Sequence, residues 1–120
     1  MRVPVQLTFR GMAYSDALDA HVRLRAEKLE QLFDRIVSCR VVVELVGHHH
    51  RHGDRFHVSI NLDLPGHEIL VEHARSDDQG PETVYAAVDR AFYDALREIE
   101  EWARHERVQR HDESANTRAS

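Results

Sequence analysis

Cysteine is nearly absent from the sequence, and this limits the classes of protein to which the chain can belong. Cys39 is the only cysteine in 120 residues, so no disulfide can form within the chain and a reducing compartment is the expected environment. No apolar run approaches the roughly 20 residues of a membrane-spanning helix. Residues 1–9 alternate in polarity instead of forming a signal peptide. We therefore expect a cytoplasmic protein without a membrane partner.

The motifs that mark enzymes are also missing. The sequence has no glycine-rich phosphate loop, no nucleophile elbow and no paired-carboxylate motif. Cys39 could be a nucleophile, but it alternates with Val41 in an apolar pattern, where a free cysteine is usually a small core residue. We therefore predict that the chain is not an enzyme and uses no cofactor and no small-molecule substrate.

Positive charge is scarce. The formal net charge is −5, from 16 basic and 21 acidic residues, whereas a typical nucleic-acid-binding domain is basic. Ten histidines are counted as neutral in this sum, and mild acid would make them positive. Composition alone argues weakly against a nucleic-acid partner.

What the sequence does contain is clear periodicity. Apolar and polar residues alternate with the period of half-buried strands in four segments, which are residues 3–9, 39–46, 56–64 and 69–72. Short connections, including the Pro65–Gly66 turn, favour antiparallel hairpins among the last three.

Two segments instead have the spacing of amphipathic helices. Ser15 and Asp16 begin the first, which is about 20 residues long with an apolar stripe from Leu18 to Phe33 that extends to Ile36. The second begins at Pro81 and ends near Arg107. Its stripe contains Tyr85, Val88, Phe92, Leu96, Ile99 and Ala103.

The order β-α-β-β-β-α predicts an α+β fold with two layers, in which both helices cover one face of a four-stranded sheet. Residues 1–107 form the domain, and residues 108–120, which lack an apolar period, are predicted to be a flexible tail. The other sheet face would meet water, and it carries Arg40, Glu44, His57, Ser59, Asn61 and Glu72.

Basic residues on the two helices are candidates for an RNA-binding groove. Arg25 and Lys28 share a face of the first helix, whereas Arg90, Arg97 and Arg104 are seven residues apart along one line of the second. Two helices packed side by side form a groove, and these side chains could contact a sugar–phosphate backbone there.

The alternative is that the second helix neutralises its own charge. Arg90 can pair with Asp94, Asp94 with Arg97, and Glu100 with Arg104. The residue pattern does not decide between these two interpretations.

Histidines are concentrated in a polar segment between the second and third strands, at His48, His49, His50 and His52. Imidazoles bind zinc, nickel or copper, but a structural zinc site usually adds cysteine or carboxylate ligands at defined spacing. We therefore predict an exposed loop and no functional metal site. When protonated, such a loop could also touch phosphates.

Two helical segments resemble the ribosome hibernation-promoting and ribosome-associated inhibitor family, in its short, sigma-54-modulation-protein-like form. They are AEKLEQLFDRI at residues 26–36 and VYAAVDRAF at residues 84–92. The resemblance extends over about residues 3–107 in the same order and spacing, and the family has the β-α-β-β-β-α fold.

The resemblance implies binding to the small ribosomal subunit, alone or within the 70S ribosome, in the channel for messenger and transfer RNA. Translation would thereby stop during stress. Arg25, Lys28 and Arg97 match basic RNA-contacting positions of the family. Three neighbouring positions that are usually basic carry Gln31, Asp94 and Glu101, and each lost phosphate contact removes a counterion-release contribution.

Three functions therefore remain open. The first, which we expect, is a ribosome-binding inactivator. The second is a metal- or pH-responsive module that uses the histidine segment. The third is a protein–protein adaptor whose contact is the acidic end of the second helix with Trp102.

Overall fold

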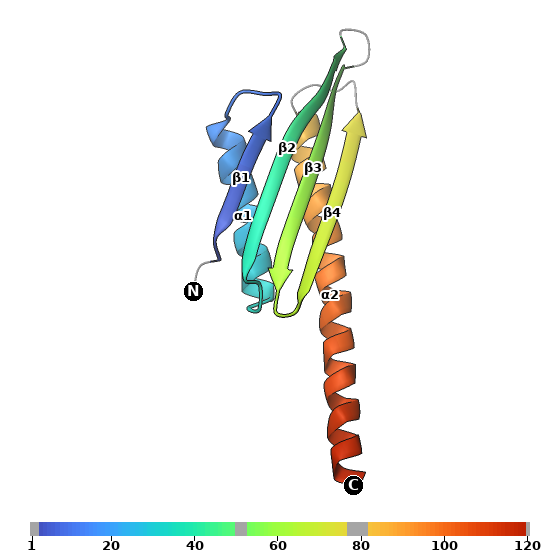
Figure 1. The fold of residues 1–120 in the computed structure, drawn as a ribbon. Helices are drawn as coiled ribbons and strands as arrows, with labels where there is room; N and C mark the ends of the chain where they lie inside the picture. The colour runs from blue at the N-terminus through green and yellow to red at the C-terminus, as the bar shows by residue number, and fades with distance from the viewer. Residues whose placement is uncertain (1–2, 50–52, 77–81, 120) are drawn as a thin grey trace.

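The computed structural model describes the backbone of residues 3–49, 53–76 and 82–119, and the side chains of residues 3–46, 55–74 and 84–108. Its elements follow the predicted order, and they are β1 (Val5–Arg10), α1 (Asp16–Leu32), β2 (Ser38–His49), β3 (Gly53–Leu64), β4 (His67–Ser76) and α2 (Glu82–Ala119). Both helices lie on the same face of the sheet (Figure 1), which confirms the two-layer α+β fold.

The four strands lie in the spatial order β1-β2-β3-β4. β2, β3 and β4 are antiparallel neighbours, as the short connections predict, whereas β1 runs parallel to β2. A parallel pair needs a crossover connection, and α1 provides it. Ser15 caps α1 as predicted, because its Oγ accepts a hydrogen bond from the Leu18 N–H at 3.2 Å.

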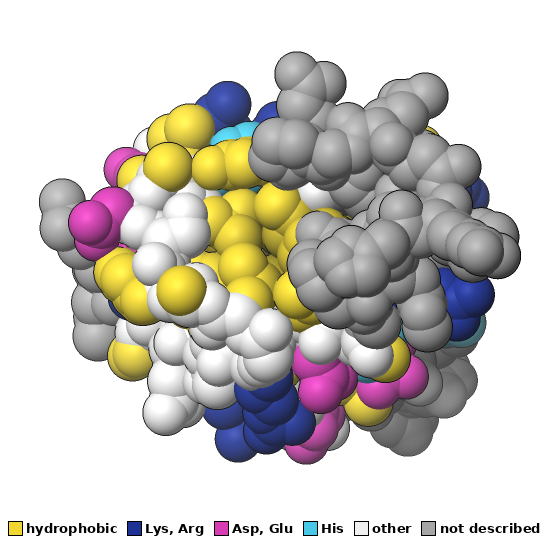
Figure 2. All heavy atoms as spheres, turned by 90° about the horizontal axis from the view of Figure 1, so that it is seen from above, with side chains coloured by type: hydrophobic (Ala, Val, Ile, Leu, Met, Phe, Trp, Pro, Cys, Tyr) yellow, Lys and Arg dark blue, Asp and Glu magenta, His cyan; other side chains and the backbone are white. Residues whose placement is uncertain are grey.

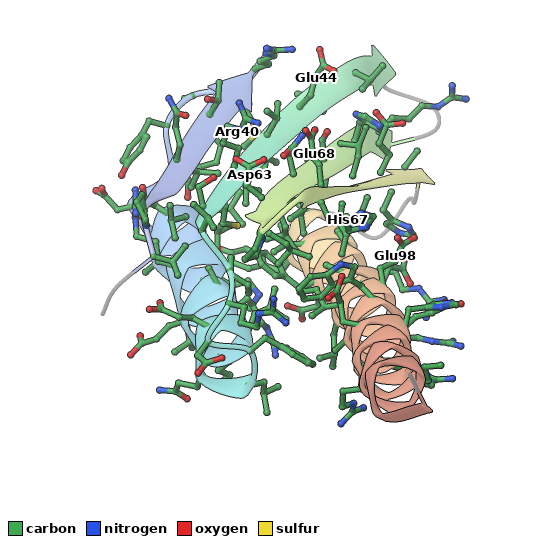
Figure 3. All side chains as sticks on the ribbon, turned by 60° about the horizontal axis from the view of Figure 1, so that its bottom comes forward. Arg40, Glu44, Asp63, His67, Glu68 and Glu98 are labelled. Atoms are coloured by element: carbon green, nitrogen blue, oxygen red, sulfur yellow. The ribbon has the colours of Figure 1, made fainter. Side chains whose placement is uncertain are left out.

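The core lies between the sheet and the helices. Each inner strand contributes alternate side chains, such as Val41 and Val43 from β2 and Val58 and Ile60 from β3, all of which are buried. Figure 3 shows the opposite sheet face with Arg40, Glu44, Asp63 and Glu68 projecting away from the helices. That polar face is linked across strands because Arg40 donates to Asn61 Oδ1 at 3.2 Å, and Asn61 donates to Glu68 Oε1 at 2.7 Å.

Hydrophobic side chains also gather at the end of the molecule where α1 and α2 begin. In the view from above, hydrophobic side chains occupy the middle of this end, with charged side chains toward the rim (Figure 2). Tyr14 lies in the connection that precedes α1, is 63% exposed, and packs edge-on against Phe9 with ring centroids 5.3 Å apart. The Tyr14 hydroxyl donates to Asp19, and this hydrogen bond raises the pKa of Tyr14 and lowers the pKa of Asp19.

The helix α2 packs against the sheet through small residues. Ala87, Ala91 and Ala95 are fully buried at intervals of four residues, which lets the helix backbone lie close to the strands. Tyr85 and Leu96, which the sequence placed in the apolar stripe, are only half-buried. The buried face of α2 is therefore offset from the predicted stripe, which did not include Ala87, Ala91 and Ala95.

The end of α1 differs from the prediction. The helix has 17 residues and ends at Leu32, and Phe33 is its C-cap with extended backbone angles. Its N–H donates to the Leu29 carbonyl at 3.0 Å. Ile36 is buried as expected but lies in the connection to β2 rather than in the helix.

The end of α2 also differs. The helix continues to Ala119 instead of ending near Arg107, so the segment expected to be a tail has helical backbone. Residues 108–119 contain neither glycine nor proline, so nothing in the sequence stops the helix. The domain boundary at residue 107 stays a prediction. Pro81 lies outside the described residues.

Two glycines have left-handed backbone angles, both with φ of +69°. Gly66 follows Pro65 in the β3–β4 hairpin, where a type II turn requires positive φ at its third residue. A Cβ on Gly66 would meet nothing within 4 Å. Gly11, between β1 and α1, is different because a Cβ there would lie 2.7 Å from the Leu45 carbonyl oxygen. Within the described ranges, no helix has the length and apolar character needed to cross a membrane.

Candidate nucleic-acid interface

A groove of about 490 Å³ runs between α1 and α2 at the surface of the helical layer. The sequence explains which side chains reach it. One face of α1 is buried in the core, so neighbouring positions on its flank meet α2. The buried residues are Leu18, Val22, Ala26 and Leu29. The groove is lined by Arg25, Lys28, Leu29, Asp89, Arg90, Phe92, Tyr93 and Leu96.

Asp89 joins the two helices at one end of the groove. Its Oδ1 lies 2.6 Å from His21 Nε2 and accepts a hydrogen bond from Arg25 Nε at 2.9 Å. The His21 ring also packs edge-on against Tyr85, with centroids 5.1 Å apart. These contacts fix the spacing of the helices and hold the Arg25 guanidinium at the groove.

Arg90 and Tyr93 form the α2 rim of the groove. The Arg90 guanidinium lies 5.3 Å from the centroid of the Tyr93 ring, and its Nε lies 3.5 Å from Asp94. Lys28, on the opposite rim, makes no ion pair with any residue whose side chain the structure describes. The rim therefore offers one free ammonium group and one guanidinium group that is held only by exposed contacts.

Charge distinguishes this groove from two other depressions. The inter-helical groove has three basic residues and one acidic residue. The depression beside the start of β1 has Glu27, Glu30 and Asp34 against one basic residue, Arg35. A third depression, between β4 and α2, has five acidic residues and two basic ones. Of these three surfaces, only the inter-helical groove has an excess of positive charge.

The five basic residues predicted from sequence do not all meet in one place. Arg25, Lys28 and Arg90 line the inter-helical groove, whereas Arg97 and Arg104 line the acidic depression between β4 and α2. Arg97 follows Leu96, which lines the groove, but it lies on the opposite flank of α2, whereas Arg104 lies on the part of α2 that continues past the end of α1 at Leu32 (Figure 1). A role for any of the five in binding RNA stays a prediction.

The expected neutralisation of α2 is only partial. The Arg90–Asp94 pair forms, as predicted. Among the described side chains, neither Asp94–Arg97 nor Glu100–Arg104 forms an ion pair. Gln31 and Glu101, at positions where the resemblance implies basic residues, line the two acidic depressions rather than the groove.

The histidine segment lies largely outside what the structure describes. β2 and β3 extend into it, and the backbones of His48 and His49 pair with Asp54 and Gly53, so the loop is shorter than expected. His50 and His52 lie outside the described residues. Among the described side chains, no group of three histidine, cysteine or acidic residues could hold a metal ion.

Cys39 and Trp102 both pack against other parts of the fold. Cys39 is buried in β2 as predicted, and burial raises the pKa of its thiol to about 12, which keeps it protonated and unreactive. Trp102, expected as an exposed contact, is instead half-buried. Its ring stacks on His67 with centroids 6.1 Å apart, and the Arg35 guanidinium lies 5.0 Å from its centroid. The tryptophan joins α2 to the β3–β4 hairpin and to the connection between α1 and β2.

Sequence reasoning missed two residues of the groove, Asp89 and Tyr93. Tyr93 carried a usable signal, since it is an aromatic residue outside the apolar stripe of its helix, which indicates a surface position. Asp89 carried none, because its partners are 68 and 64 residues away in the sequence.

Comparison with known proteins agrees with this fold. The model of the family described as sigma 54 modulation protein / S30EA ribosomal protein matches residues 5–107. The chain belongs to this family. No curated protein sequence matches it.

Two solved structures are similar to this S30EA-family chain. One is a ribosomal subunit interface protein from Coxiella burnetii, with a TM-score of 0.68 and 17% identity over 84% of this chain and 98% of that one. The other is the N-terminal domain of Protein Y from Thermus thermophilus, with a TM-score of 0.65 and 25% identity over 85% of this chain and 99% of that one. The first likeness supports the fold alone.

Proposed function

We propose that this chain is a ribosome-associated factor that binds ribosomal RNA of the small subunit through the inter-helical groove and stops translation during stress. The observation that carries the proposal is the charge of the groove. A chain with a net charge of −5 concentrates three basic residues in the groove between its helices, beside a single acidic one. Membership of the family described as sigma 54 modulation protein / S30EA ribosomal protein supports the same partner.

The proposed mechanism is steric and needs no chemical step. Arg25, Lys28 and Arg90 contact phosphates and release the counterions that surround them, which supplies affinity without sequence preference. The folded domain then fills the channel that messenger and transfer RNA require. Arg97 and Arg104, exposed farther along α2, are proposed as secondary contacts. Such a factor acts in the cytoplasm, where ribosomes are.

Sedimentation with 30S subunits and 70S ribosomes at several salt concentrations tests the proposal. The groove variant is Arg25→Gln with Lys28→Gln. Its matched control is Arg10→Gln with Arg55→Gln, which removes the same charge from two exposed residues on the outer face of the sheet. We expect the groove variant to bind more weakly, with a slope of log affinity against log salt that is shallower by about 1.4 to 1.8. The control should bind like the wild type.

Two results would contradict the proposal. If the wild type fails to sediment with ribosomal particles even at low salt, the ribosome is not the partner. If the groove variant and the control weaken binding equally, overall charge rather than the groove determines binding. Replacement of Arg97 and Arg104 by glutamine then measures the secondary contacts, whose loss should reduce the slope less than the groove variant does.

A further inference from the structure

The rim of the inter-helical groove carries an aromatic side chain that the core does not use. Tyr93 is 48% exposed, whereas the adjacent Phe92 is 5% exposed and packs in the core. Because Phe92 already fills the space beneath α2, the packing of the helix does not require a large ring at position 93. Tyr93 therefore exposes apolar ring surface beside the basic residues of the groove.

The surroundings of Tyr93 combine a flat apolar surface with positive charge on both rims. Leu29, Phe92 and Leu96 form the apolar part of the groove, Lys28 lies on the α1 rim, and the Arg90 guanidinium lies against the tyrosine ring. An occupant should therefore have negative charge and a flat apolar face close together. Duplex nucleic acid hides the faces of its bases by pairing and stacking, and an acidic peptide has no such repeating faces.

We propose that Tyr93 is a stacking platform for one unpaired RNA base, with Arg25 and Lys28 holding the phosphates next to that base. This inference rests on the proposed function and makes it more specific, because it states that the RNA in the groove is single-stranded. Aromatic rings in single-strand binding sites contribute in this way for any base, since every base has a flat face. The guanidinium of Arg90, which already lies against the ring, orients it and also faces the bound strand.

Substitution of Tyr93 separates stacking from charge. Tyr93→Leu keeps an apolar side chain and every charge but removes the ring, whereas Tyr93→Phe keeps the ring. The matched control is Tyr14→Leu, because Tyr14 is also an exposed tyrosine but lies before α1, outside the groove lining. Since Tyr93 and Tyr14 are both exposed, all three variants should fold, and urea unfolding checks this.

The first readout is affinity for 30S subunits and for a single-stranded oligouridylate of about ten nucleotides, compared with the same strand in a duplex. We expect Tyr93→Leu to weaken binding of the single strand by about 5- to 150-fold. Its salt slope should equal that of the wild type, because no phosphate contact is lost. Tyr93→Phe should restore most of the affinity, and Tyr14→Leu should leave it unchanged.

The second readout is direct. A base stacked on the ring shifts the Tyr93 ring proton resonances upfield when oligouridylate is added, and a merely structural tyrosine would show no such shift. Wild-type affinity in Tyr93→Leu, together with weaker binding in the Arg25/Lys28 variant, would overturn the stacking platform and leave the proposed function intact. Equal affinity for single strand and duplex would also overturn it. Tyr93-dependent binding of the oligonucleotide without any binding of ribosomal particles would support the platform and contradict the ribosomal partner.

Discussion

Replacement of Asp89 by asparagine should change stability and RNA binding in opposite directions. Asp89 is the single acidic residue of the groove, and it accepts from Arg25 Nε while its Oδ1 also contacts His21 Nε2. It therefore stabilises the contact between α1 and α2. It also neutralises part of the charge that the proposed function assigns to phosphate binding. Asparagine has nearly the same shape and can still accept hydrogen bonds, so the substitution tests the negative charge.

The expected loss of stability is small. The side chains of Arg25 and Asp89 are 38% and 41% exposed, and ion pairs between groups this exposed contribute about 1 kcal/mol at most. Because asparagine keeps part of the hydrogen bonding, we expect the free energy of unfolding to fall by roughly 0.5–1 kcal/mol. The expected gain in binding follows from Coulomb's law. Two unit charges about 4 Å apart in water interact by about 1 kcal/mol, which corresponds to about fivefold tighter binding.

Urea unfolding measures the first effect, and titration of 30S subunits at two salt concentrations measures the second. Asp34→Asn is the matched control. It makes the same change in net charge, but Asp34 is exposed beyond the end of α1 and makes no ion pair with the described side chains. The control should leave stability unchanged and affect binding only slightly. Weaker RNA binding by Asp89→Asn would refute the reasoning, because it would show that Asp89 prepares the groove for RNA rather than masking its charge.

Three further predictions concern the stability of the fold. Gly66→Ala should lower the free energy of unfolding by about 1–2 kcal/mol through backbone strain alone. Gly11→Ala should lower it by roughly 1–3 kcal/mol more, because its Cβ would collide with a backbone oxygen. Equal losses in urea unfolding would contradict this. Burial raises the pKa of Cys39 from 9.0 to about 12, so between these pH values the thiol ionises only in the unfolded chain. The free energy of unfolding should therefore fall as pH rises from 9 to 12, and it should fall less in Cys39→Ala. His67→Ala should lower the free energy of unfolding by about 0.5–1.5 kcal/mol. It should also shift the fluorescence of Trp102, the only tryptophan in the sequence, to longer wavelength. An unchanged spectrum would mean that the stacking of His67 on Trp102 does not persist in solution.

Much of the fold could be predicted because its strands bury one face each. The alternation from Phe56 to Leu64 is regular, and every apolar member of it is buried. Such a pattern specifies both the strand and the side that faces the helices. The start of α1 was predictable for a similarly local reason, since the cap is formed by Ser15 on its own helix.

Other features could not be predicted because the sequence pattern did not contain the relevant contact. The inner face of α2 depends on Ala87, Ala91 and Ala95, and alanine is common on buried and exposed helix faces alike. The groove depends on Asp89 and its partners on α1, which only the packing of the two helices brings together. Basic positions could be identified from their helical spacing, but the separation of Arg97 from the groove depends on which flank of α2 faces α1, and only the packing of the helices decides that.

The two flanks of α2 have opposite charge, and this gives the molecule a transverse electric dipole. One flank faces the basic inter-helical groove, and the other faces the acidic depression beside β4. At physiological salt the Debye length is about 8 Å, so a polyanion at contact distance interacts with the nearer flank and is largely screened from the farther one. This acidic protein should therefore attract a polyanion more strongly in the orientation that presents the groove than in the reverse orientation. The distribution of charge between the two flanks of α2, rather than the net charge, then determines how the protein meets a charged partner.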